Sequence, residues 1–156
     1  MHPPEAPNDA RGAALIDQLG YAGLVPLLLL AALLWLVGAD LRPWVAIALS
    51  AYAALVVSFL GGIHWGIGWS AMATPGARCA PQRWHFLWGV APSLLAWPGL
   101  LMPPDAGLAW LGLVLLVCYL VDRRLYPPAG LGHWLKLRFR LSTVAALCCF
   151  IGAAAL

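Results

Sequence analysis

The residues best able to do chemistry are histidines. Of the four in the chain, His64 stands inside a long apolar stretch, and His85 lies at the start of another. An ionisable group inside an apolar segment is rare and points to function, because imidazole can relay a proton or ligate a metal or haem. His64 and His85 are therefore candidates for a bis-histidine haem site. The alternative is that His64 hydrogen-bonds to a free backbone carbonyl.

One carboxylate lies at the edge of an apolar stretch and needs a partner. Asp122 is followed by Arg123, and Arg138 comes 16 residues later, so either arginine could pair with it. The spacing of histidines, cysteines and acids does not bring together the three or four ligands of a zinc site. We predict no catalytic residue, no metal and no resident cofactor, with haem as the alternative. The candidate functional cluster is His64, Trp65, His85, Asp122, Trp134 and Arg138.

The amino-acid composition indicates the environment in which these residues lie. Of 156 residues, 63% are hydrophobic and only 10% are charged, whereas a soluble domain carries about 25% charged residues. This excludes a soluble globular protein, a disordered chain and a nucleic-acid-binding protein with a basic face. The lipid bilayer is the expected partner.

The apolar stretches predict an all-α bundle of five transmembrane helices. A helix of about 20 residues crosses a hydrocarbon core of about 30 Å, and open sheets leave unpaired backbone groups in lipid. The stretches do not alternate as strands of a membrane barrel would. The five predicted spans cover residues 19–38, 44–73, 84–102, 106–121 and 141–156.

Basic residues predict the orientation of the bundle. With five spans, eight of the nine Lys and Arg residues fall on one side and Arg42 alone falls on the other, and basic loops are cytoplasmic. The N-terminus is then cytoplasmic and the C-terminus outside, in a bacterial inner membrane. Residues 1–18 are expected to form a mobile tail before a membrane domain at 19–156. Glu5, Asp9 and Asp17 argue against a cleaved signal peptide.

The second span, residues 44–73, is too long for a straight crossing. Its 30 residues make about 45 Å of helix, so the helix either breaks or extends beyond the bilayer. Gly61 and Gly62 mark the expected break, because glycine weakens a helix.

Small residues recur every fourth position along the same span and predict close helix packing. They run from Ala46 to Ser70, and the expected packing positions are Ser50, Ala54, Ser58, Gly61, Gly62 and Gly66. Gly62 should therefore touch another helix, and Gly62→Leu should disrupt assembly more than His64→Ala does.

Three motifs resemble the bacterial family called domain of unknown function 3429, whose eukaryotic relatives are mitochondrial and include transmembrane protein 69. They are L-G-Y-A-G-L-V-P at 19–26, S-F-L-G-G-I-H-W-G at 58–66, and Asp122 followed by W-L-K-L-R at 134–138 and Leu141-Ser142. Leu135 stands where the family usually has Tyr, and Ser142 where it has Thr. The resemblance implies a small membrane protein of several spans, and it implies no activity.

These observations favour a non-catalytic helical module that acts by interaction with other membrane proteins or by self-association. Two alternatives stay open. One is a haem- or quinone-linked redox carrier that uses His64 and His85. The other is a small-solute or proton pathway through a broken second span.

Overall fold

The protein is helical throughout the part that the computed structural model describes, which is residues 7–73 and 82–156. Helices α1 and α2 together cover the first predicted span, and α3, α4, α5 and α6 correspond to the other four. Their bounds are α1 Pro7–Ala22, α2 Val25–Leu36, α3 Arg42–Ala73, α4 Gln82–Leu101, α5 Pro104–Leu125 and α6 Leu135–Ala154. Two short 3-10 turns, Pro127–Ala129 and Gly132–Trp134, join α5 to α6.

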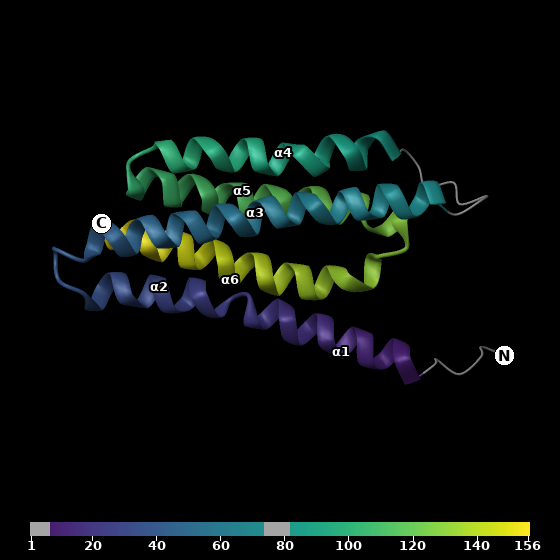
Figure 1. The fold of residues 1–156 in the computed structure, drawn as a ribbon, viewed down its shortest axis with the longest axis horizontal. Coiled ribbons are helices and arrows are strands. Elements are labelled where there is room, and N and C mark those ends of the chain that lie inside the picture. Colours follow the sequence, from purple (N-terminus) through teal and green to yellow (C-terminus); the bar gives the residue numbers. More distant parts are fainter. Residues whose placement is uncertain (1–6, 74–81) are drawn as a thin grey trace.

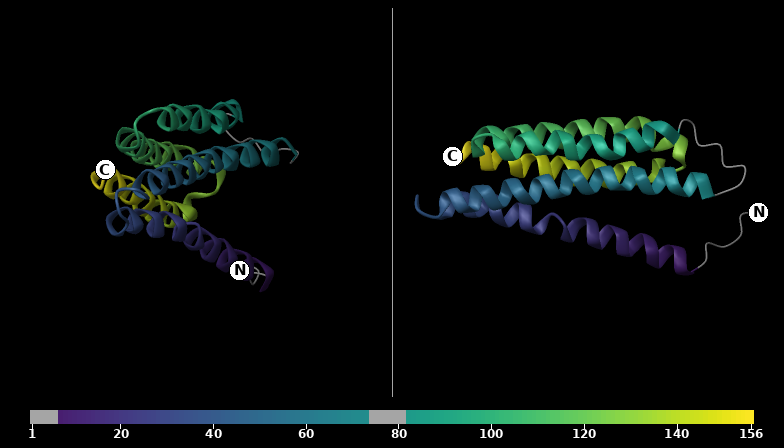
Figure 2. Two further views of the ribbon diagram at one scale, coloured as in Figure 1. Left: turned by 60° about the vertical axis from the view of Figure 1, so that its left-hand side comes forward. Right: turned by 45° about the horizontal axis from the view of Figure 1, so that its top comes forward.

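The helices form an antiparallel bundle. Helices α3, α4, α5 and α6 lie side by side, and α2 packs on α3 and α6, while α1 diverges from the bundle (Figures 1 and 2). The start of α1 and the C-terminus lie at opposite ends (Figure 1). We call the end with the C-terminus the outer end, and the opposite end, where α3 and α5 finish, the inner end.

The first span is divided at Gly23-Leu24 instead of forming one helix. Pro26 lies at the start of α2, where its missing N–H needs no partner, and its ring disfavours a helix running through the preceding turn. The break exposes the Gly23 carbonyl, and the Tyr52 hydroxyl of α3 donates a hydrogen bond to it at 3.0 Å. A side chain of the central helix thus satisfies the backbone that the proline disrupts.

The break predicted at Gly61-Gly62 was wrong, because α3 is one continuous helix of 32 residues. A glycine in a helix interior costs only about 1 kcal/mol relative to alanine, and packing against the neighbouring helix offsets it here. The remaining explanation for the length of this span is that its inner part extends beyond the hydrocarbon core.

Between Ser50 and Gly66, the predicted stripe of small residues contacts other helices only in the outer part of α3. Ser50 and Ala54 are buried, and Ser58 is half-buried, whereas Gly62 and Gly66 are exposed and a Cβ atom at either would meet nothing within 4 Å. The prediction that Gly62 touches another helix of this chain was therefore wrong. A four-residue spacing drifts about 40° per step around a helix, so the stripe leaves the contact face, which continues through Gly61, His64 and Gly68.

Within residues 7–73 and 82–156, four helical segments are long and apolar enough to cross a membrane: Arg11–Leu36, Arg42–Ala73, Pro104–Leu125 and Gly132–Ala154. Helix α4, with 20 residues, is not one of them, so its crossing remains a prediction, as does the orientation. Residues 7–18 belong to α1, where a mobile tail was expected; Ala10, Ala13, Ala14 and Leu15 are good helix formers. Residues 1–6, Arg78 and Cys79 lie outside the described part.

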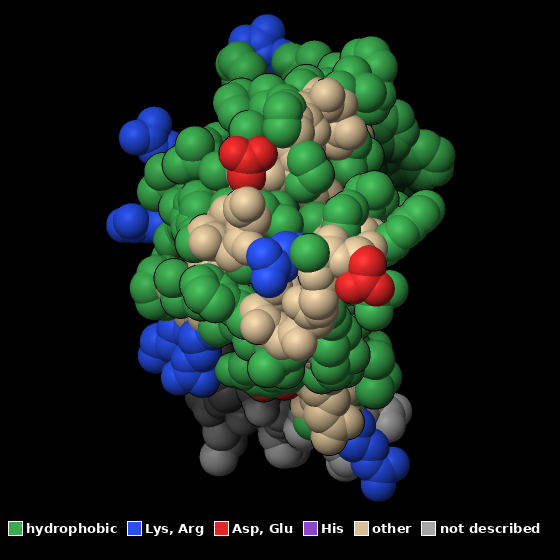
Figure 3. Space-filling view, turned by 90° about the vertical axis from the view of Figure 1, so that its left-hand side faces the viewer, with side chains coloured by type: hydrophobic (Ala, Val, Ile, Leu, Met, Phe, Trp, Pro, Cys, Tyr) green, Lys and Arg blue, Asp and Glu red, His purple; other side chains and the backbone are tan. Residues whose placement is uncertain are grey.

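The core is apolar, and so is much of the surface. Leucines from three helices, α2, α3 and α5, are fully buried, among them Leu27, Leu34, Leu49 and Leu108. Figure 3 looks onto the outer end and shows hydrophobic side chains over most of it, with only a few charged groups. Many large apolar side chains are also exposed, such as Phe59 at 68%, as expected where lipid takes the place of water.

Candidate functional site

A buried chain of four polar side chains joins four helices at the inner end. His64 of α3, His85 of α4, Asp122 of α5 and Arg138 of α6 are exposed by 0%, 1%, 2% and 8%. The two histidines meet through their Nδ1 atoms at 3.0 Å, and His64 Nε2 lies 2.8 Å from Asp122 Oδ1. Arg138 donates two N–H groups to Asp122 Oδ2, the Nε–H at 2.9 Å. We call these four residues the polar network.

Proton positions in the polar network follow from what each partner can accept. A carboxylate only accepts hydrogen bonds, so His64 Nε2 carries a proton and donates it to Asp122. Neutral His64 then has a lone pair on Nδ1, which accepts from the Nδ1–H of His85. The arrangement leaves the negative charge of Asp122 paired with Arg138, which is what burial of an ion in an apolar medium requires.

Helix direction explains why these residues meet. Helices α3 and α5 run toward the inner end, and α4 and α6 run away from it (Figure 1). Asp122 lies in the last turn of α5, whereas His85 and Arg138 lie in the first turns of α4 and α6. The last turn of a helix that runs toward the inner end thus meets the first turns of neighbouring helices that run away from it. The short connection from α5 to α6 includes Gly130 at φ 78°, a left-handed conformation that glycine adopts without strain.

Glycines let α3 and α4 approach closely enough for the histidines to touch. A Cβ atom on Gly61 would lie 2.4 Å from the carbonyl oxygen of Gly89, so the two backbones are in contact there. Trp65 covers Gly89 and makes an edge-to-face contact with Phe86, with ring centroids 5.6 Å apart. Trp65 was predicted to belong to the cluster, and it supports the α3–α4 contact rather than joining the polar network.

Tyr126 belongs to this site, and the sequence prediction missed it. It is 3% exposed and its ring centroid lies 5.5 Å from that of His64. Burial, together with the negative charge of Asp122, raises the pKa of Tyr126 to about 12, so the hydroxyl stays protonated. Tyr126 follows Asp122 by four residues, a spacing that places two side chains on one helix face, and that spacing could have identified it.

An apolar cavity of about 690 Å³ borders the polar network between α1, α2, α3 and α6. Trp134, also predicted for the cluster, lines this cavity together with Tyr126 and Arg138. Ser142 lines it too, is 2% exposed, and its hydroxyl has no hydrogen-bond partner among the described residues.

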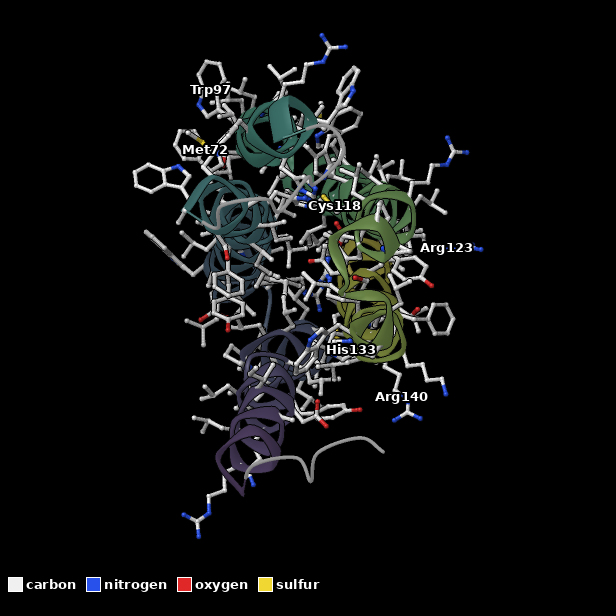
Figure 4. All side chains as sticks on the ribbon, turned by 90° about the vertical axis from the view of Figure 1, so that its right-hand side faces the viewer. Met72, Trp97, Cys118, Arg123, His133 and Arg140 are labelled. Carbon is white, nitrogen blue, oxygen red and sulfur yellow. The ribbon has the colours of Figure 1, made fainter. Side chains whose placement is uncertain are left out.

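Other polar side chains of this region do not belong to the polar network. Figure 4 shows Cys118 inside the bundle, and Arg123 and Arg140 projecting from its outside. Asp122 therefore pairs with Arg138 and not with Arg123. His133 lies between α6 and α1, in a shallow depression with Asp17 and Tyr21 (Figure 4).

The contact between the histidines does not suit a haem iron between them. Two axial imidazoles on opposite sides of a haem iron hold their nitrogens about 4 Å apart, since each bond is about 2 Å long. Here the two Nδ1 atoms are 3.0 Å apart and share a hydrogen bond. Among residues 7–73 and 82–156, histidine, cysteine and acidic side chains do not gather in groups of three that could hold a metal ion.

The sequence over residues 13–154 matches the family described as "Protein of unknown function (DUF3429)". The match spans most of the 156 residues, including all four members of the polar network. The chain belongs to this family. Membership accounts for the motifs around Gly61, His64 and Asp122 that indicated it.

A relative in the DUF3429 family is transmembrane protein 69 of Xenopus tropicalis, which is 36% identical over 154 residues. The alignment covers 96% of this chain and 56% of the relative, so the chain spans about half the length of that protein. No solved structure matches the chain. The protein is thus a membrane member of a family without an assigned activity.

Proposed function

We propose that this protein is a non-catalytic helical membrane module that acts by interaction with other membrane proteins or by self-association, in a bacterial inner membrane. The observation that supports it is the saturation of the polar network. Both ring nitrogens of His64 and both oxygens of Asp122 are already engaged. Groups that bond to one another in this way hold four helices together, and His64 and Asp122 are not free to act on a substrate as a base or a nucleophile.

The free small residues of α3 offer a place for a neighbouring helix. Gly62 and Gly66 are exposed at the inner part of α3 and have open space around them. Small residues let transmembrane helices approach closely, and these two are not used within the chain. A helix of a second protein, or of a second copy, could pack there.

Native extraction tests this proposal. The full chain is extracted in a mild detergent at its native expression level, and native mass spectrometry gives its assembly state. We expect a complex larger than one chain, and we expect Gly62→Leu to release the single chain without lowering its melting temperature. Ala51→Leu is the matched control, because Ala51 is also an exposed small residue of α3. A single chain in the unsubstituted protein would contradict the proposal.

The other two functions have less support. The haem form of the redox carrier based on His64 and His85 needs an iron between nitrogens that are already in contact at 3.0 Å. The pathway through a broken second span needs a break that the continuous α3 does not have. Reporter fusions after Pro128 and after Asp40 test the proposed orientation, with cytoplasmic and outside signals expected respectively; the reverse pattern would overturn it.

A further inference from the structure

The cavity beside the polar network has apolar walls and one polar end. Its walls come from five helices, with Leu19 of α1, Leu27 of α2, Phe59 of α3, Leu115 of α5 and Leu141 of α6 among them. Its volume, about 690 Å³, lies within the range of about 300–1,000 Å³ that is usual for small-molecule sites. In a membrane such a space admits a hydrocarbon chain.

The polar end contains a hydrogen-bond donor that lacks a partner. Ser142 lines the cavity and is 2% exposed, and its hydroxyl has no hydrogen-bond partner among the described residues. A buried polar group without a partner destabilises a protein by about 1–3 kcal/mol. A ligand atom that accepts its hydrogen bond would remove this penalty.

Charge decides between an anionic and a neutral head group. Arg138 is the cation at the polar end, and its charge is already paired with Asp122. An anionic phosphate or carboxylate would add a second negative charge near Asp122 without a free cation to offset it, in a medium where charge is expensive. A neutral carbonyl oxygen accepts a hydrogen bond without that penalty.

Aromatic side chains favour a flat head group. Tyr126 and Trp134 line the same end of the cavity as Arg138 and Ser142. Aromatic side chains pack well against other planar rings, whereas the glycerol ester of a lipid is neither flat nor rigid. A ring that carries a carbonyl and a long hydrocarbon chain meets all of these conditions.

We propose that this cavity binds an isoprenoid quinone, whose carbonyl oxygen accepts a hydrogen bond from Ser142 and whose tail lies between α1, α2 and α3. The inference goes beyond the proposed interaction between proteins. It concerns binding alone, and His64 and His85 remain bonded to each other. The ligand would occupy the cavity, separate from the exposed strip at Gly62 and Gly66.

Binding of a short-chain quinone to the purified full chain tests this proposal. The probe is tritium-labelled decyl-benzoquinone, and the measurement is saturable binding in one detergent. We expect Ser142→Ala to weaken binding about five- to tenfold, as loss of one neutral hydrogen bond does. Ser50→Ala is the matched control, because Ser50 is also buried and unpartnered but does not line the cavity; it should bind as the wild type does.

A second variant and two competitors complete the test. Ala145→Leu adds bulk at the cavity wall and should abolish binding. Palmitate and a diacylglycerol should displace the probe poorly. The proposal is overturned if the wild type shows no saturable binding, if Ser142→Ala binds as tightly as Ser50→Ala, or if either competitor displaces the probe as well as unlabelled quinone does. Gly62 and Gly66 do not line the cavity, so the binding assay does not test self-association.

Discussion

Two sites each join four helices, and they do so by opposite physical means. At the outer end, Gly152 of α6 receives Leu34, Leu49 and Leu108 from α2, α3 and α5; a Cβ atom on Gly152 would lie 2.6 Å from Leu49. At the inner end, the polar network joins α3, α4, α5 and α6. The outer site depends on volume, because dispersion contacts accept any apolar group of the right size. The inner site depends on the identity of each partner.

This difference predicts how the stability of the protein should respond to substitutions at each site. In an apolar contact, a lost group costs in proportion to the space it leaves. In a buried ion pair, removal of one member leaves the other unpaired, which costs more than removal of both. The polar network should therefore be sensitive to single substitutions and tolerant of paired ones, and the outer site should respond to total volume.

The largest effect is expected at Asp122. Asp122→Leu leaves the guanidinium of Arg138 buried without its partner, and we expect about 3–5 kcal/mol of lost stability, measured as a lower melting temperature in detergent. Asp105→Leu, an exposed acid in the first turn of α5, is the control and should change little. The double variant Asp122→Leu/Arg138→Met should regain much of the loss; a double variant no more stable than the single one would contradict the ion-pair argument.

The next effect is expected at His64 and reverses the order predicted from sequence. His64→Ala leaves Asp122 Oδ1 and His85 Nδ1 without a partner, and an unsatisfied buried group costs about 1–3 kcal/mol. Gly62→Leu places its side chain in open space, so the melting temperature of the single chain should hardly change. Thermal melts of both variants in the same detergent make the comparison; a lower melting temperature for Gly62→Leu would refute it.

Gly152 tests the outer site. Gly152→Ala forces a Cβ atom against the side chain of Leu49, and overpacking costs about 1–3 kcal/mol, partly offset by the better helix propensity of alanine. The net loss should be about 1 kcal/mol, seen in the melting temperature. Leu49→Val removes volume at the point of contact. The double variant Gly152→Ala/Leu49→Val should therefore lose less stability than the sum of the two single losses. Additive losses would show that volume is not what limits this site.

Tyr52 should give the smallest effect. Tyr52→Phe removes the hydrogen bond to the Gly23 carbonyl at the break between α1 and α2, and one such bond contributes about 1 kcal/mol or less. Hydrogen exchange at residues 23–28 should increase while the rest of the bundle is unaffected. Tyr119→Phe, on a different face of the bundle and in contact with Phe139, is the control. Uniform exchange across the bundle would mean that the bond stabilises the whole fold.

Hydropathy along the sequence was enough to predict most of the helices. Hydropathy predicted residues 44–73 as one span, and α3 covers Arg42–Ala73. It also predicted that His64, Asp122 and Arg138 lie toward the same membrane face, because distance along a helix is proportional to residue number. Hydropathy did not predict the start of α6 at Leu135, six residues before the expected span, since its first turns contain basic residues that form helix well.

Only the tertiary structure decided which side chains meet. The rotation of each helix about its axis places Asp122 against Arg138 and His64, turns Arg123 outward, and brings Tyr126 to the site. That rotation is set by contacts between helices distant in sequence, such as Gly61 against Gly89, and such contacts leave no trace in local composition. For the same reason Gly61 packs against Gly89 instead of marking a break in α3, and the cavity beside Ser142 exists only once the helices that line it are assembled.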